Sequence, residues 1–130
     1  MKLYAFVIDD NHLAANSLVQ MLDLLGYEAK AAYGSMAAFQ ALAKRIPDVI
    51  LTDIHMQGLN GVEMCRAFRR DPRMERTAII VMSTDTQSEL VADLREAGAH
   101  GFLPKPIGME ALEQLMQQVE QFLSSRPAVT

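Results

Sequence analysis

The sequence contains one cysteine, no tryptophan and no long run of apolar residues. A single cysteine, Cys65, cannot form a disulfide within the chain, and such cysteine use is typical of a reducing compartment. No stretch is long enough to span a bilayer, and no basic leader followed by an apolar segment opens the chain. We therefore expect a cytoplasmic protein that makes no contact with a membrane.

Positive charge is also scarce. The chain has 12 Lys and Arg residues against 16 Asp and Glu residues, which gives a net charge of -4. Domains that bind nucleic acid usually carry a basic surface, so we expect no direct contact with nucleic acid. Five arginines between Arg66 and Arg76 are a local exception. We interpret them as a solvated surface, with docking of a partner as the alternative.

Apolar sequence is sufficient for one compact domain, because half of the 130 residues are hydrophobic. Short runs rich in β-branched residues alternate with helical stripes at the spacing that βαβ units require. The predicted strands are Leu3–Ile8, Glu28–Ala31, Val49–Thr52, Ile79–Met82 and Gly101–Leu103.

Five helices are predicted between and after these strands. Gly26 closes the first helix, and the second stops before Pro47. The third helix runs from about Gly61 to Arg70. Thr86 and Glu89 have the spacing of a capping box at the start of the fourth helix.

This alternation predicts an α/β fold with a flavodoxin-like, doubly wound sheet of five parallel strands in the order 2-1-3-4-5 and five helices. We expect one domain over residues 1–124 and a flexible tail over residues 125–130. A stand-alone chain and a piece of a longer protein are both compatible with the sequence.

Four of the predicted strands lead to polar or charged side chains. Asp9 and Asp10 follow the first strand, Asp53 the third, Ser83 the fourth and Lys105 the fifth. In such a sheet the ligand crevice lies outside the carboxyl ends of the strands, so these side chains are expected to converge. Carboxylates about 4 Å apart repel one another by roughly 4 kcal/mol at an effective dielectric constant near 20. The cluster therefore needs a cation, and Mg²⁺ prefers such oxygen ligands.

These residues, in this order, resemble the receiver domain of bacterial two-component response regulators. DIHMQGLNG is similar to the aspartate loop of that family and AGAHGFLPKP to its closing motif, and the resemblance covers residues 3–123. It implies that Asp53 accepts a phosphoryl group from a phosphohistidine of a histidine kinase or phosphotransfer protein. It also implies that Asp9, Asp10, Asp53 and the backbone carbonyl of His55 hold Mg²⁺.

The resemblance further implies a switch. Ser83 and Lys105 would contact the phosphoryl group, the loop before the fourth helix would follow Ser83, and Phe102 would turn inward. The face made by the fourth helix, the fifth strand and the fifth helix would then change its preference for a protein target, and a homodimer is possible on phosphorylation. The resemblance thus implies a signalling domain that assists its own phosphorylation and dephosphorylation, and it does not imply an enzyme that turns over a substrate. Pro106 suggests a cis peptide bond that orients Lys105.

Each of these residues taken alone has an ordinary structural interpretation. Asp9 and Asp10 fit a cap or a loop start, Ser83 fits a turn, and Lys105 fits a solvated surface. The functional interpretation therefore depends on the whole set.

Two other classes of function are compatible with parts of the pattern. A docking module that keeps the fold but works without phosphorylation is left open by Gln57 and Thr84, which replace the usual residues of the family. A phosphatase with an aspartate nucleophile is disfavoured. Proteins of that class carry a DxD motif after the first strand, whereas Asp9 and Asp10 are adjacent here. The sequence does not identify the cognate kinase, the target, the signal, the oligomeric state or the lifetime of a phosphorylated form.

Overall fold

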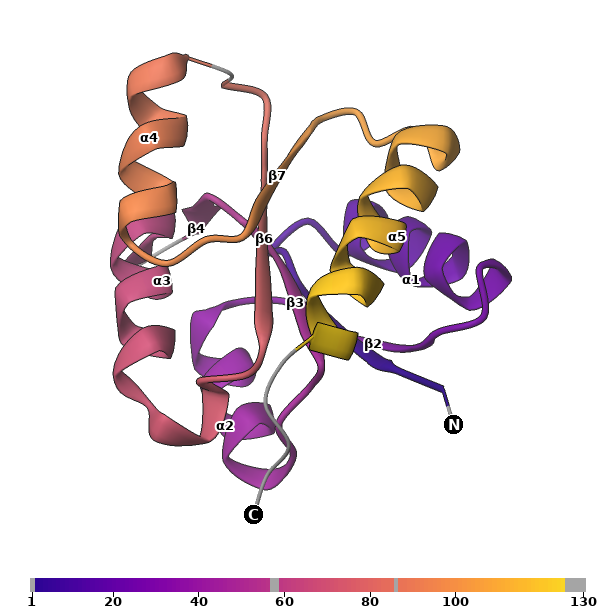
Figure 1. Cartoon of the computed structure of the whole chain (residues 1–130), viewed down its shortest axis with the longest axis horizontal. Coiled ribbons are helices and arrows are strands. Elements are labelled where there is room, and N and C mark those ends of the chain that lie inside the picture. Colours follow the sequence, from indigo (N-terminus) through magenta and orange to yellow (C-terminus); the bar gives the residue numbers. More distant parts are fainter. Residues whose placement is uncertain (1, 57–58, 86, 126–130) are drawn as a thin grey trace.

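The structure is a computed structural model that describes residues 2–56, 59–85 and 87–125 (Figure 1). The strands in these ranges are β1 (Tyr4–Ile8), β2 (Glu28–Ala32), β3 (Val49–Asp53), β4 (His55–Met56), β5 (Leu59–Asn60), β6 (Ala78–Ser83) and β7 (Gly101–Pro104). The helices are α1 (His12–Leu24), α2 (Ser35–Lys44), α3 (Gly61–Arg70), α4 (Ser88–Glu96) and α5 (Met109–Ser125), with a short 3-10 helix η1 (Pro72–Met74).

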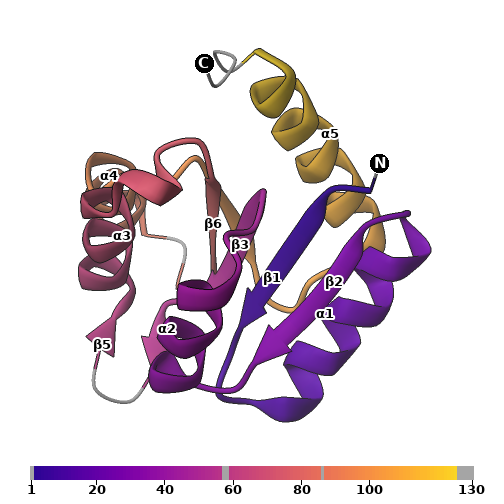
Figure 2. The same ribbon diagram turned by 90° about the horizontal axis from the view of Figure 1, so that it is seen from below.

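The main sheet has the order β2-β1-β3-β6-β7, and all its neighbouring strands are parallel (Figure 2). This confirms the predicted fold class and the order 2-1-3-4-5. The strand order reverses between β1 and β3, where Ile8 is paired with Thr52. Asp9 and Asp53 therefore leave the sheet at the same level, at the point where a doubly wound sheet forms its crevice.

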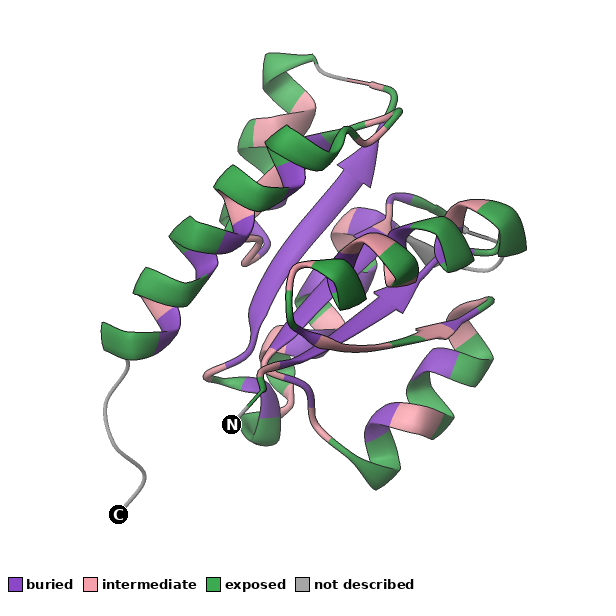
Figure 3. Ribbon diagram, turned by 90° about the vertical axis from the view of Figure 1, so that its right-hand side faces the viewer, coloured by how far each residue is buried: buried purple, intermediate pink, exposed green. Residues whose placement is uncertain are grey.

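Two apolar clusters hold the helices on the sheet. Alternate residues of β1 point to opposite faces, so Phe6 and Ile8 belong to one cluster and Ala5 and Val7 to the other. Helices α2, α3 and α4 cover the first face, and α1 and α5 cover the second (Figures 1 and 2). The central strands β1, β3 and β6 are almost entirely buried, the edge strands β2 and β7 are mostly only partly buried, and the outer helix faces are exposed (Figure 3). Burial on both faces explains why the central strands β1, β3 and β6 appear as nearly continuous apolar runs in the sequence.

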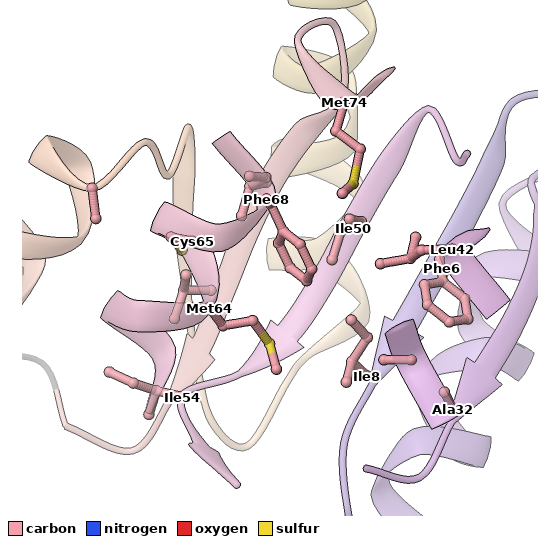
Figure 4. Close-up of a cluster of buried hydrophobic side chains, with 14 of the residues drawn as sticks. Phe6, Ile8, Ala32, Leu42, Ile50, Ile54, Met64, Cys65, Phe68 and Met74 are labelled. Carbon is pink, nitrogen blue, oxygen red and sulfur yellow. The ribbon is translucent and has the colours of Figure 1, made fainter. Parts of the chain in front are cut away.

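The first cluster is densest between α3 and the centre of the sheet. Phe68 and Met64 of α3 lie over Ile50 of β3 (Figure 4). All three side chains are fully buried. Burying a side chain of this size stabilises the fold by about 1.5–3 kcal/mol, so this contact fixes α3 on the sheet.

Most helix boundaries agree with the prediction, and two details differ. Gly26 follows α1 with φ of +98°, in the left-handed region that favours glycine. Helix α4 begins at Ser88 with Gln87 as its N-cap, and Gln87 makes no side-chain capping bond. The capping box was predicted at Thr86 and Glu89, and Thr86 lies outside the described residues, whereas the structure assigns the N-cap to Gln87. The antiparallel pairing of β4 with β5 was not predicted, because two-residue strands carry no periodicity.

Helix α5 extends through Ser125, one residue into the predicted tail, and residues 126–130 lie outside the described ranges. Within those ranges, no helix combines the length and the apolar character that crossing a membrane requires.

Candidate functional site

The three predicted carboxylates meet at the carboxyl edge of the sheet. One oxygen each from Asp9, Asp10 and Asp53 lies within 4.8 Å of the other two. Asp9 is buried, with 1% of its surface exposed, while Asp53 is half-buried and Asp10 is exposed. The cluster is therefore open to solvent on one side, as a site for an ion or a reactant must be.

Asp9 is fixed by bonds to its neighbours. Its N–H donates to the carbonyl of Ala32 over 3.1 Å, which ties it to the end of β2. Its Oδ1 accepts the backbone N–H of Asn11 over 3.0 Å. Both bonds act before any ligand arrives, so the position of the Asp9 carboxylate is set by the fold.

Lys105 reaches the cluster from the end of β7. Its Nζ donates to Asp9 Oδ2 over 2.9 Å and lies 3.5 Å from Asp53 Oδ1. The backbone N–H of Lys105 donates to the carbonyl of Ser83 over 2.9 Å, which joins the ends of β7 and β6. The peptide bond between Lys105 and Pro106 is cis, as predicted.

Burial and these contacts shift the pKa values of both Asp53 and Lys105. Burial raises the pKa of the Asp53 carboxyl, and the negative charge of Asp9 raises it further, against the opposing effect of Lys105. Burial acts to lower the pKa of the Lys105 ammonium, but the hydrogen bond to Asp9 and the charges of both carboxylates leave it raised. Lys105 therefore stays charged, and it is the cation that offsets carboxylate repulsion at this edge.

Ser83 lies at the end of β6, one residue beyond the partner of Asp53 in the strand register. Its side chain is buried, with 1% exposed, and its Oγ accepts the backbone N–H of Asp85 over 2.9 Å. Phe102 of β7 is partly buried and packs against the first apolar cluster. The structure thus brings Ser83 to the edge that carries Asp53. The inward turn of Phe102 stays a prediction.

His55 takes part through its backbone. Its N–H donates a hydrogen bond to the Asp53 carboxylate, and this bond lowers the pKa of that carboxyl. The predicted role of the His55 carbonyl as a metal ligand is a separate matter and stays a prediction. Gln57 lies outside the described residues.

The donor set fits Mg²⁺. Three carboxylates from the ends of two neighbouring strands are hard oxygen ligands, and one of them, Asp10, faces solvent. Mg²⁺ usually keeps several waters and binds few carboxylates, so a half-open cluster of this kind suits it. Asp9, Asp10 and Asp53 are the side chains that would hold it.

Sequence reasoning did not single out the residues beside Asp10. An open hollow of about 580 Å³ is lined by Asp10, by Tyr33 after β2 and by Met36 at the start of α2. The Tyr33 ring stacks on His12 with 3.9 Å between centroids, and its hydroxyl donates to Asn16 Oδ1 over 2.6 Å. No motif marks this group in the sequence, because its members meet only after β1 and β2 pair.

Comparison with known proteins places this geometry in one family. The family model of the response regulator receiver domain matches residues 5–117. The response regulator MprA of Mycobacterium ulcerans (strain Agy99) is 32% identical over 123 residues, which is 95% of this chain and 51% of MprA. The chain thus spans about half the length of the curated relatives it matches.

Solved structures agree with this result. Chemotaxis protein CheY4 of Vibrio cholerae aligns with a TM-score of 0.86 at 28% identity, over 92% of this chain and 99% of CheY4. The signal receiver domain of a DNA-binding response regulator from Colwellia psychrerythraea 34H aligns with a TM-score of 0.85 at 25% identity, over 92% of this chain and 99% of that domain.

Proposed function

Because the chain belongs to the response regulator receiver family, a family of signalling domains of two-component systems, we propose that Asp53 is its phosphoacceptor. The donor in this proposal is a phosphohistidine of a histidine kinase or phosphotransfer protein. The observation that carries it is the position of the Asp53 carboxylate, half-open to solvent and 3.5 Å from the Lys105 ammonium.

The chemical step is a transfer between two nucleophiles. An Asp53 oxygen forms a bond to phosphorus while the bond between phosphorus and the donor imidazole nitrogen breaks, and the electron pair of that bond returns to the imidazole. The product is an acyl phosphate on Asp53. Lys105 stabilises negative charge on the phosphoryl oxygens, and the bonds that fix Asp9 keep the site in place before the donor arrives.

We propose that Mg²⁺ is required and is held by Asp9, Asp10, Asp53 and the backbone carbonyl of His55. When bound, the ion supplies positive charge next to the transferred phosphoryl group. In this proposal Asp10 contributes the ligand that faces solvent.

The output in this proposal is a change of protein-binding preference. The Ser83 hydroxyl donates a hydrogen bond to a phosphoryl oxygen, Phe102 turns inward, and the face made by α4, β7 and α5 binds a protein target in the new state. A homodimer on phosphorylation is part of the same proposal. The proposed domain covers residues 1–124, and it assists its own phosphorylation and dephosphorylation.

A direct test incubates the protein with Mg²⁺ and phosphoramidate, followed by intact mass spectrometry. We expect one hydroxylamine-labile phosphoryl group on wild type and none on Asp53→Asn. Asp23→Asn, which changes an exposed carboxylate on α1, should behave as wild type. An adduct that forms equally on Asp53→Asn would refute the assignment. No adduct on wild type would favour the docking module that works without phosphorylation.

A further inference from the structure

Thr52, the residue before Asp53 in β3, is fully buried and brings a hydroxyl group into an apolar environment. Its Oγ1 lies 3.1 Å from the backbone carbonyl oxygen of Asp53 and 3.3 Å from Sδ of Met64, which extends from α3 toward the sheet (Figure 4). A threonine hydroxyl carries one proton, and a thioether sulfur is a weaker acceptor than a carbonyl oxygen. The hydroxyl therefore donates mainly to the Asp53 carbonyl.

The peptide group between Asp53 and Ile54 is held from both sides. Its carbonyl oxygen accepts the Thr52 hydroxyl, and its N–H donates to the carbonyl of Met82 in β6 over 3.1 Å. Because a peptide group is a rigid plane, two bonds at opposite edges fix its orientation. Thr52 thus sets the direction in which the chain leaves β3.

The next peptide group, between Ile54 and His55, bonds the candidate phosphoacceptor itself. Its N–H, from His55, donates to the Asp53 carboxylate, and its carbonyl oxygen accepts the N–H of Gly61 over 2.8 Å. Ile54, which joins the two planes, is 3% exposed, and a Cβ on Gly61 would clash with it. A rotation of the first plane is therefore passed to the second, and so to the Asp53 carboxylate.

A second buried threonine provides an internal comparison. Thr77, directly before β6, is 2% exposed, and its Oγ1 donates to the carbonyl of Pro47 over 2.9 Å. This bond is of the same kind as that of Thr52, but it lies at the amino end of β6, whereas Asp53 lies at the carboxyl end of β3. If a buried threonine hydroxyl served only stability, both residues would behave alike.

We propose that Thr52 is a positioning residue of Asp53. Its hydroxyl orients the peptide group after Asp53 and thereby holds the His55 N–H against the Asp53 carboxylate. The inference rests on the proposed function only for its effect on the rate of phosphorylation. The hydroxyl does not touch the phosphoryl group. It keeps the carboxylate aligned before the donor arrives, and such alignment accelerates a transfer between two groups.

Amide hydrogen exchange of the unmodified, metal-free protein tests the positioning. Thr52→Val removes the hydroxyl and keeps the branched shape, so the His55 amide should exchange roughly fivefold faster, because one hydrogen bond contributes modestly to stability. Thr52→Ser keeps the hydroxyl and should stay within about twofold of wild type. Thr77→Val loses a bond of the same kind elsewhere and should leave His55 unchanged. Unchanged exchange of His55 in Thr52→Val would disprove the positioning.

The rate at which phosphoramidate and Mg²⁺ modify Asp53 tests the consequence. Thr52→Val should react roughly fivefold more slowly than wild type, whereas Thr52→Ser and Thr77→Val should stay within about twofold. Circular dichroism checks that each variant is folded. If Thr52→Val fails to fold, Thr52→Ala, which also lacks the hydroxyl, takes its place. Equal rates in wild type and in the variant without the hydroxyl would overturn the proposal.

Met64→Leu separates the two acceptors of the Thr52 hydroxyl. Leucine has nearly the volume of methionine and no sulfur, so the hydroxyl keeps the Asp53 carbonyl as its acceptor. The rate of phosphorylation should therefore not fall by more than about twofold. A loss as large as that of Thr52→Val would overturn the route through the carbonyl.

The two proposals fail separately. Exchange of the His55 amide is measured without any phosphoryl group, so the positioning of Asp53 stands or falls by itself. Absence of an adduct on wild type would overturn the proposed function, even if His55 exchanges faster in Thr52→Val. A normal adduct on wild type with an undiminished rate in Thr52→Val would leave the phosphoacceptor in place and overturn the role of Thr52.

Discussion

The ammonium of Lys105 lies between two carboxylates, 2.9 Å from Asp9 Oδ2 and 3.5 Å from Asp53 Oδ1. It bonds more closely to the buried partner and leaves the half-open one less engaged. The contact with Lys105 therefore leaves the Asp53 carboxylate less engaged than that of Asp9, as the proposed role of Asp53 as a nucleophile requires.

The first prediction concerns this cation. Lys105→Met removes the positive charge that opposes protonation of Asp53, so the pKa of the Asp53 carboxyl should rise further above its ordinary value. Carboxyl-carbon NMR of the metal-free protein measures this titration. Lys44→Met, which removes an exposed lysine at the end of α2, should not shift the Asp53 signal. A lower pKa in Lys105→Met would contradict the electrostatic account.

The second prediction concerns Mg²⁺. Asp10→Asn removes a charge from the proposed ligand that faces solvent, so Mg²⁺ affinity measured by calorimetry should fall by about tenfold or more while the fold is kept. Asp23→Asn is the control for the loss of one negative charge. Equal affinity in Asp10→Asn and wild type would exclude Asp10 from the metal site.

The third prediction compares two glycines that both have positive φ. Gly26→Ala meets no atom within 4 Å, so its cost is the conformational one of about 1–2 kcal/mol. Gly98→Ala pays the same conformational cost and also forces Arg69 from its bonds, so it should be clearly more destabilising. Urea unfolding measures both. Equal losses of unfolding free energy would mean that Arg69 adapts without cost.

The fourth prediction concerns pH and His100. Its Nδ1 accepts the N–H of Ile79 over 3.0 Å and lies 3.1 Å from Arg69 Nη2, so the ring is neutral in the folded state. Burial, together with the Arg69 charge, lowers the pKa of His100 to about 4.

Because the unfolded chain takes up this proton near pH 6.5, the His100 contribution is complete above that pH and is lost as the pH falls toward about 4. Because His100 is exposed to solvent, which screens its charge, the loss should be only roughly 1–2 kcal/mol. Urea unfolding at about pH 7 and about pH 4.5 should show a smaller acid loss in His100→Gln than in wild type. An identical loss in both proteins would assign the acid sensitivity to other groups.

Much of the fold could be predicted because the relevant signals are periodic. The continuous apolar run before Asp9 fixes β1 as a doubly covered strand, and handedness rules leave few orders for five parallel strands. The convergence of Asp9, Asp53 and Lys105 follows from that order alone, since the carboxyl ends of neighbouring strands lie together.

The parts that were missed depend on side-chain geometry. The five arginines appear equivalent in the sequence, yet Arg69 lies four residues after the buried Cys65 and so on the margin of the buried face of α3. That spacing was the available signal for its inward position. The preference of Lys105 for Asp9 over Asp53 had no such signal, because it depends on rotamers that only the packed site selects.

Cys65 has a practical consequence of its own. It is the one thiol of the sequence, it is fully buried in α3, and burial raises its pKa to about 11. At neutral pH it is therefore almost inert toward alkylating reagents, because the thiolate is the reactive form. A single cysteine engineered on the surface of this protein can then carry a spectroscopic label without replacement of the native residue.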